Sequence, residues 1–391
     1  MGSLLTTDEV AERLGVKAAT VYAYVSRGLL RSRRNADGKG SLFDRADVDA
    51  FVAGRRRTTT PAIRTGITLI RDGALFYRGR DVTGLAGTES FESVATLLWT
   101  GEPGHEAFPV DPELVDLATR VTRPLPATAR LADRLRVTVA AVAAADPLRF
   151  DTTSAAVVAT GRQLLSTMVH ALPQRSPATE GDSLAAALWH RLSPQPPTPE
   201  GIRALDAALV LLADHDLAAS TLAARVAAST RAHPYAVVSA GLAALDGPLH
   251  GAASSLAHTL LAEAMSGPDP VAIVSERLRA AGTSGTVPGF GHPLYPDGDP
   301  RATTLLALVD GPARRVAEQL GAVMRTRSGV LPNVDLALAA LTLRHDMPAD
   351  AGEAIFAVAR TAGWLAHALE EYAARPLRYR PSGRYAGESP T

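Results

Sequence analysis

The chain has 391 residues, of which 46% are hydrophobic and 20% are charged, and it contains no cysteine. This composition excludes a disordered protein, and the missing thiols exclude disulfides, thiolate metal ligands and a cysteine nucleophile. No stretch reaches the roughly 18 uncharged apolar residues of a membrane helix, and the acidic start MGSLLTTDEVAERLG is unlike a signal peptide, so we expect a cytoplasmic protein with no membrane partner.

The net charge of zero conceals a basic N-terminal segment. Residues 1–57 hold 11 Lys and Arg against 7 Asp and Glu, which fits a polyanionic partner or is a small imbalance without function. In this segment Thr7 is expected to cap a first helix, and a second helix, Ala18 to Arg27, follows a turn at Gly15 and ends at Gly28. Two short helices joined by a tight turn are the helix-turn-helix pattern.

A small wing should follow the two helices, turning at Asp37-Gly38-Lys39-Gly40 and returning along residues 41–43. A third helix is expected from Arg45 to Val52. Residues 58–65 are polar and contain Pro61, which indicates a linker to a second domain, 66–391. That domain is Ala- and Leu-rich with a period near 3.6, so the fold class is mainly α. Its only strand-like pieces are residues 67–70 and 75–77, a hairpin that turns at Asp72-Gly73.

His250 stands in the segment GPLHG, just before an apolar helical run over residues 252–264. The positive end of that helix dipole disfavours protonation of the imidazole. A neutral imidazole at this place can hydrogen-bond a thioester carbonyl and stabilise an enol. The alternative is an ordinary capping or core histidine.

The segment Pro288-Gly289-Phe290-Gly291-His292 has two glycines that let backbone amides approach a ligand closely, as the phosphates or pantetheine of CoA require. His292 and Arg301 are close enough in sequence to face one anionic ligand, although the spacing also fits an ordinary loop. Asp335 stands at the start of a helix expected over Leu336 to Leu343, where it is either a functional carboxylate or a plain N-cap.

Other polar residues carry less information when taken alone. Asp214, His215, Asp216, Ser220 and Thr221 are expected in mid-helix on a solvated face, and Arg360 and Arg380 would pass for surface arginines. The His, Asp and Glu residues are too dispersed for a metal site, and HExxH, a Walker-type phosphate loop and a GxSxG elbow are absent from the sequence.

Taken together and in order, several segments resemble the citrate synthase family over about residues 66 to 387. They begin with IRDG, YRG, SFESV and LLWTGE, and they continue with ADHDLAAST, GPLHGAA, PGFGHPLY followed by DPR, PNVD, ARTAGWLAHALE and RYRPSGRYAG. The resemblance implies all-helical large and small domains, the small one about residues 225–335. It also implies condensation of acetyl-CoA or propionyl-CoA with oxaloacetate in a homodimer, with no cofactor, because the CoA thioester is a substrate.

The resemblance also implies roles for individual residues. His250 would polarise the acyl-CoA carbonyl, Asp335 would remove the α-proton, and His292 would hydrogen-bond the oxaloacetate carbonyl. Oxaloacetate would be held by His215, Arg301, Arg360 and, from the other subunit, Arg380, while Pro288, Gly289, Phe290 and Gly291 would bind CoA.

The chain departs from the family pattern at several places. It reads GPLHGAASS where the family usually has GPLHGGAN, it is aliphatic after Asp335, and Pro296 stands where a basic residue is common. These changes bear on CoA affinity and on acyl-chain preference.

The N-terminal domain resembles the MerR/excisionase type of winged helix-turn-helix. This implies a recognition helix with Thr20, Tyr22 and Tyr24 as candidates for base contacts, and Arg31, Arg33 and Arg34 near phosphates. Such a domain can instead serve only for packing or dimerisation. Two alternatives to an enzyme therefore stay open: a DNA-binding regulator whose synthase-like body senses oxaloacetate or acyl-CoA without turnover, and a catalytically silent partner subunit.

Overall fold

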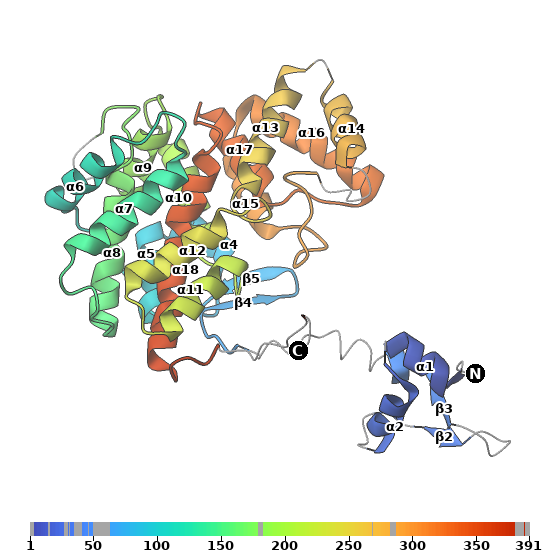
Figure 1. The fold of residues 1–391 in the computed structure, drawn as a ribbon. Helices are drawn as coiled ribbons and strands as arrows, with labels where there is room; N and C mark the ends of the chain where they lie inside the picture. Colours follow the sequence, from blue (N-terminus) through green and yellow to red (C-terminus); the bar gives the residue numbers. More distant parts are fainter. Residues whose placement is uncertain are drawn as a thin grey trace. The chain divides into compact units, whose positions relative to one another are not determined.

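The computed structural model divides the chain into two compact units, Met1–Arg64 and Thr65–Thr391, which are considered separately (Figure 1). The residues that the structure describes are 4–14, 16–26, 30, 32–34, 41–45, 47–49, 63–178, 183–267, 269–281, 287–379 and 387. Among these residues no helix is long and apolar enough to span a membrane.

The N-terminal unit combines two helices with a three-stranded antiparallel sheet. The helices are α1 (Thr7–Leu14) and α2 (Ala18–Ser26), and the strands, in the order β1-β3-β2, are β1 (Leu4–Thr6), β3 (Ser41–Asp44) and β2 (Arg33–Arg34). They enclose a small core of their own, formed by Leu5, Val10, Ala11, Val21, Leu30, Phe43 and Val48. The helix-turn-helix and the antiparallel wing therefore form as expected, with β1 as an unforeseen third strand.

The cap of α1 differs from the prediction. Thr6, not Thr7, is the capping residue, because its hydroxyl accepts a hydrogen bond from the Glu9 N–H at 3.4 Å. The Glu9 carboxylate in turn accepts from the Thr6 N–H at 2.7 Å, which completes a capping box. Residues 45 and 47–49 of the expected third helix are helical. Its other residues lie outside the described part of the chain, as do the expected wing turn at residues 37–40 and Gly15, Arg27 and Gly28.

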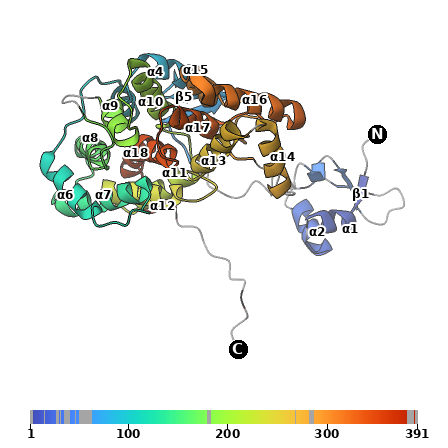
Figure 2. The same cartoon turned by 90° about the horizontal axis from the view of Figure 1, so that it is seen from above.

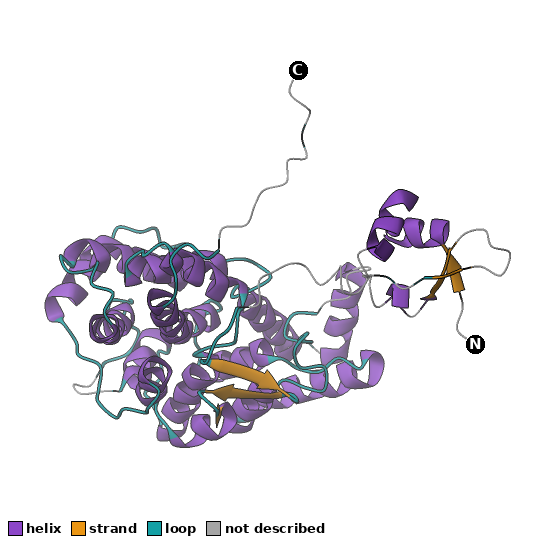
Figure 3. Ribbon diagram, turned by 90° about the horizontal axis from the view of Figure 1, so that it is seen from below, coloured by secondary structure: helices purple, strands orange, loops and turns teal. Residues whose placement is uncertain are grey.

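The second unit starts with a small antiparallel sheet, β4 (Thr68–Arg71), β5 (Ala74–Tyr77) and β6 (Arg80–Asp81) (Figure 3). The hairpin turn at Asp72-Gly73 is confirmed, since both residues have positive φ (53° and 75°), as a two-residue turn of type I′ requires. A second pair, Arg78 and Gly79, repeats this geometry with φ of 49° and 81° and leads into β6, a strand that was not predicted.

The rest of the unit is helical, as predicted. Helix α18 runs through its middle and is buried along almost its whole length, packed against α5, α7, α8, α10, α11 and α12 (Figure 2). Helices α13 to α17 pack mainly on one another beside this group (Figure 1). The helix bounds are α4 (Val82–Thr88), α5 (Phe91–Thr100), α6 (Pro112–Thr122), α7 (Leu131–Ala145), α8 (Ser154–His170), α9 (Leu184–Leu192), α10 (Pro199–Leu212), α11 (Ala219–Ser229), α12 (Pro234–Leu245), α13 (Ala253–Ser266), α14 (Pro270–Ala281), α15 (Pro300–Leu308), α16 (Gly311–Ser328), α17 (Val334–Arg344) and α18 (Ala351–Ala373).

Candidate active site

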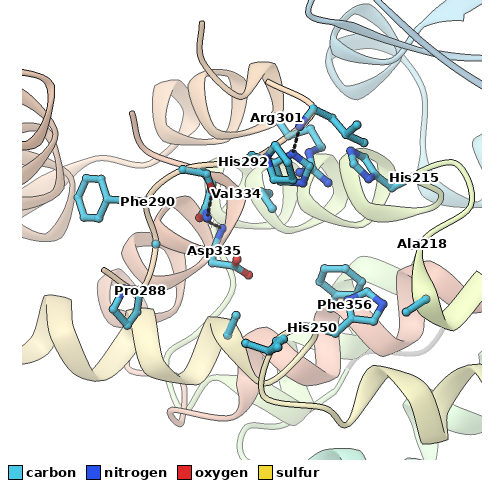
Figure 4. A pocket seen from close by; sticks show the side chains of 18 of the residues that line it. His215, Ala218, His250, Pro288, Phe290, His292, Arg301, Val334, Asp335 and Phe356 are labelled. Carbon is cyan, nitrogen blue, oxygen red and sulfur yellow. Dashed lines mark hydrogen bonds between the residues drawn. The ribbon is translucent and has the colours of Figure 1, made fainter. Parts of the chain in front are cut away.

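A cavity of about 730 Å³ is lined by the starts of α11, α13, α15 and α17, by the loops that precede these helices, and by Phe356 and Arg360 of α18. Figure 4 shows Asp335 between one end of the cavity, with His292 and Arg301, and the other, with His250 and Phe356. All described candidates of the second unit line this cavity: His215, His250, Pro288, Gly289, Phe290, Gly291, His292, Arg301, Asp335 and Arg360. Arg380 lies outside the described residues.

His250 sits in the turn between α12 and α13, where its Nε2 is 2.8 Å from the Ser220 hydroxyl. Its ring also meets the edge of Phe356, with 5.6 Å between the ring centroids. Burial, together with the positive charge of Arg360, lowers the pKa of His250 to about 4. The imidazole is therefore neutral at pH 7, as expected, although burial is the main cause.

His292, His215 and Tyr295 form a cluster of rings at the other end of the cavity. The Leu294 N–H donates to Nδ1 of His292 at 3.2 Å, so the neutral ring carries its proton on Nε2 and can donate there. Burial, assisted by Arg301, lowers the pKa of His292 to about 4. His215 has its pKa lowered well below the ordinary value for the same reasons, and its Nε2 lies 2.9 Å from the Tyr295 hydroxyl.

The expectation that residues 214–221 form a solvated helical face is wrong. The segment after Asp214 breaks the helix between α10 and α11, with Asp216 at a φ of 52°. Asp214, His215, Ser220 and Thr221 are all buried. The break is held from another part of the chain, because the Tyr77 hydroxyl accepts from the Asp214 N–H at 3.0 Å and donates to its carbonyl at 2.7 Å.

Two buried arginines supply the positive charge of the cavity. Arg301 is only 3% exposed, and Asp299 holds it through two hydrogen bonds of 3.0 and 2.9 Å. Arg360, 1% exposed, donates from Nε to the Leu212 carbonyl at 2.8 Å. Among the described residues its two terminal nitrogens have no hydrogen-bond partner. Neither residue is a surface arginine, and Arg360 has two donors available for an anionic ligand.

Asp335 is not an N-cap. Asn333 caps α17, since its side-chain oxygen accepts the Asp335 N–H at 3.0 Å, and Asp335 is the second residue of the helix. Within the described part of the chain the Asp335 carboxylate has no hydrogen-bond donor. Burial, opposed by Arg301 and assisted by Asp299, raises the pKa of Asp335 to about 6. This value suits a general base near neutral pH.

The glycines of the segment 288–291 also have a structural use, and their predicted contact with CoA stays a prediction. Gly289 and Gly291 have φ of 84° and 79°, and this backbone pairs with the chain before α17. The Gly291 N–H donates to the Leu331 carbonyl at 2.8 Å, and the Asn333 N–H donates to the Gly289 carbonyl at 2.9 Å. The amide of Gly291 is thus already engaged, and the glycines fix the Asp335 helix beside this loop.

The aliphatic run after Asp335 belongs to the core. Residues 336–341 are all buried, and a Cβ on Gly289 would lie 3.0 Å from the Cβ of Leu336. The side chains that depart from the family pattern at this point therefore pack behind the cavity. Of the serines in GPLHGAASS, Ser254 donates to the Gly251 carbonyl at 3.1 Å and Ser255 to the Glu353 carboxylate at 2.6 Å.

Three polar residues that the sequence analysis did not select contribute to the site: Ser220, Tyr295 and Asp299. Asp299 stands in the DPR motif, which was a usable signal for a partner of Arg301. Ser220 and Tyr295 contact histidines 30 and 80 positions away, and no local pattern reports such contacts. In the described residues no group of three or more His, Cys, Asp or Glu side chains could hold a metal ion.

The candidates for nucleic-acid contact lie in the first unit. Tyr22 on α2 is 50% exposed, Thr20 and Tyr24 are half-buried, and Arg33 on β2 is exposed. Tyr24 packs against the small core. The Arg34 side chain and all of Arg31 lie outside the described residues.

Comparison with known proteins gives matches over almost the whole chain. Residues 57–382 match a family model described as citrate synthase, C-terminal domain, and residues 4–56 match one described as helix-turn-helix domain. A 2-methylcitrate synthase of Corynebacterium glutamicum is 31% identical over 351 residues, 81% of this chain and 89% of that protein. A citrate synthase of Synechocystis sp. is 30% identical over 361 residues, 84% and 89% of the two chains. The crystal structure of citrate synthase from Thermotoga maritima superposes with a TM-score of 0.69 at 25% identity, covering 85% of this chain and 95% of that one.

Proposed function

Because the chain belongs to the citrate synthase family, whose members are acyltransferase-type enzymes, we propose that it condenses acetyl-CoA or propionyl-CoA with oxaloacetate and water. The products are citrate or 2-methylcitrate and free CoA. One observation carries the proposal: a carboxylate with a pKa of about 6 and two imidazoles with pKa values of about 4 line a single cavity with two buried arginines.

The first step is removal of an α-proton from the acyl group by Asp335. Its carboxylate is ionised at pH 7 and has no competing hydrogen bond among the described residues, so it is free to accept the proton. His250 stabilises the resulting enol by hydrogen-bonding the thioester oxygen. Ser220 occupies Nε2 of this ring, which leaves Nδ1 for the thioester. A neutral imidazole suits this role because it donates a hydrogen bond without carrying charge.

In the second step the enol carbon attacks the ketone carbon of oxaloacetate, and the ketone oxygen takes up a proton. Nε2–H of His292 is the donor that polarises this ketone, because Leu294 already occupies Nδ1. Arg301, Arg360 and His215 hold the two carboxylates. The open terminal nitrogens of Arg360 offer the planar fork that a carboxylate accepts. Water then hydrolyses the thioester of the condensation product and releases CoA, with the segment 288–291 binding the CoA arm.

We further propose a cytoplasmic homodimer in which Arg380 of each subunit binds a substrate carboxylate in the other subunit's cavity. Mixing two inactive variants tests this arrangement. Arg380→Ala and Asp335→Asn subunits, unfolded together and refolded, should regain about a quarter of wild-type activity, because half of the dimers are hybrids and each hybrid has one intact site. A mixture as inactive as its components contradicts the shared site.

Thiol release measured with oxaloacetate and each acyl-CoA tests the reaction itself. Wild-type protein and a matched carboxylate variant on the surface of α6, Asp116→Asn, should release CoA at the same rate. Asp335→Asn should lose at least about 1,000-fold in kcat, because the base is gone. Absence of release with both thioesters, while oxaloacetate still raises the melting temperature, contradicts the enzyme and favours the sensor.

A regulator that binds DNA is the second candidate, and the separately packed N-terminal unit supports it. Its α2 presents an exposed Tyr22, and its wing presents an exposed Arg33. Gel shifts on genomic fragments should show binding that Arg33→Ala weakens and that falls steeply with salt, with the exposed Arg45→Ala as a control. Equally weak binding by wild type, Arg33→Ala and Arg45→Ala at moderate salt contradicts a function in DNA binding.

A further inference from the structure

The Asp299 carboxylate connects two parts of the cavity wall without lining the cavity itself. Its Oδ1 accepts from the backbone N–H and from Nε of Arg301, both at 3.0 Å. Its Oδ2 accepts from a terminal nitrogen of Arg301 at 2.9 Å and from the Val334 N–H at 3.0 Å. The side chain is 1% exposed, so these four hydrogen bonds replace its hydration.

The two partners belong to different helices. Asp299 caps α15, which carries Arg301, and it also binds the first N–H of α17, whose next residue is Asp335. One buried carboxylate thus sets both the direction of an arginine in the cavity and the position of the helix start that presents Asp335.

Asp299 stands behind these groups. It lines a second cavity, of about 540 Å³, between α15 and α16, whereas Arg301, Val334 and Asp335 line the first. Leu331 and Pro332 share the wall of the second cavity, just before α17. Asp299 therefore reaches a ligand in the first cavity only through Arg301 and through the start of α17.

The same carboxylate acts electrostatically on the base. Burial is the main cause of the raised pKa of Asp335, Arg301 lowers that pKa, and Asp299 raises it. The other titratable side chains that line the cavity are His215, Asp216, His250, His292 and Arg360, and the three imidazoles are neutral at pH 7. Neutralising Asp299 leaves the charge of Arg301 uncompensated, and both effects lower the pKa of Asp335.

We propose that Asp299 is a positioning residue that couples oxaloacetate binding to proton abstraction, by holding Arg301 and the start of the Asp335 helix with one carboxylate. The proposal rests on the proposed function and adds that substrate binding and proton abstraction depend on the same carboxylate. A change at Asp299 must alter both the affinity for oxaloacetate and the pKa of Asp335, although the Asp299 side chain touches neither substrate.

Asp299→Asn is the test, because it keeps the shape and removes the charge. Asp297→Asn is the matched control: it removes an exposed carboxylate two residues away that, within the described residues, forms no hydrogen bond or ion pair with Arg301 or Val334. Asp299→Asn should raise the KM for oxaloacetate by about 10- to 100-fold, as expected for loss of hydrogen bonds to a charged group, and lower kcat. The acid limb of its kcat/KM profile should move to lower pH, and Asp297→Asn should match wild type in all three.

Each alternative result contradicts one part of the proposal. A raised KM with an unmoved acid limb shows that Asp299 acts on Arg301 alone, and wild-type kinetics show that it positions neither. If Asp299→Asn is too unstable for kinetics, Asp299→Glu keeps the charge but not the reach. Asp299→Glu should then raise the KM for oxaloacetate without moving the acid limb of the kcat/KM profile to lower pH. An acid limb at lower pH contradicts the electrostatic effect of Asp299 on Asp335. Titration calorimetry with oxaloacetate tests, without turnover, whether Asp299 supports substrate binding by Arg301. A wild-type protein that binds oxaloacetate but does not react therefore contradicts only the proposed function.

Discussion

Replacing Asp335 by Asn should make the protein inactive and more stable at the same time. The cavity raises the pKa of this carboxyl from 3.8 to about 6, which means that the folded protein disfavours the ionised form. At neutral pH this corresponds to a cost of about 3 kcal/mol in folding free energy. The side chain is partly exposed, so water screens part of the cost, and we expect Asn to stabilise the fold by about 1–3 kcal/mol.

The sign of the effect gives it a pH dependence. Because the folded-state pKa is raised, the penalty is largest above about pH 6 and disappears as the pH falls below 3.8, where the carboxyl becomes protonated in the unfolded state as well. Asn resembles the protonated form at every pH. The stabilisation should therefore fall to about a third of its neutral value at pH 4.5.

Urea unfolding followed by tryptophan fluorescence measures this difference. The chain has three tryptophans, and all of them, Trp99, Trp189 and Trp364, are buried in the second unit, so the signal reports that unit alone. Unfolding of wild type and Asp335→Asn at pH 7.5 and at pH 4.5 gives the two differences. An Asn variant that is no more stable than wild type at pH 7.5, or a gain that is the same at both pH values, refutes the reasoning.

Three other predictions concern the site and its support. The Asp335 carboxyl must be ionised to act as a base, so kcat/KM should decrease as the pH is lowered through about 6 and reach roughly a tenth of its plateau at pH 5. Loss of thioester absorbance measures this rate, and a decrease that begins only near pH 4 would contradict the raised pKa. Ser220→Ala removes the 2.8 Å contact to Nε2 of His250 and should lower kcat about 3- to 10-fold with the KM for oxaloacetate unchanged, whereas an unchanged kcat excludes a positioning role. Gly241→Ala would place a Cβ 2.5 Å from the Trp364 ring and should cost about 1–3 kcal/mol in urea unfolding, while Gly84→Ala on α4, with nothing within 4 Å, should cost nothing.

The sequence predicted the helical body, the first hairpin and the winged helix-turn-helix because these depend on local patterns. Asp72-Gly73 is an example, since the turn needs two residues that tolerate positive φ. The family resemblance selected residues from distant parts of the chain, and those that the structure describes in the second unit line one cavity, while their roles stay predictions. Their spacing alone did not identify them, because a histidine before a helix has many ordinary uses.

The errors came from contacts that local patterns do not contain. Asp214 and His215 looked like residues of a continuous helix, but the Tyr77 hydroxyl, from a strand more than 130 residues earlier, holds the backbone open at that point. For Asp335 the sequence left both an N-cap and a functional carboxylate open, and the N-cap is excluded because Asn333, two residues earlier, caps the helix. For Asp214 and His215, a tertiary partner therefore overrode the local helix propensity.

The separate core of the N-terminal unit has a consequence for how the protein works as a whole. Because this unit packs around a core of its own, it should unfold in a transition separate from that of the second unit, and it has no tryptophan to report that transition. A single polypeptide nevertheless fixes the ratio of the two at one to one. Any partner that binds the N-terminal unit would therefore gain one catalytic unit for each N-terminal unit bound. The local rate of turnover would then follow the occupancy of that partner, without any signal passing between the two units.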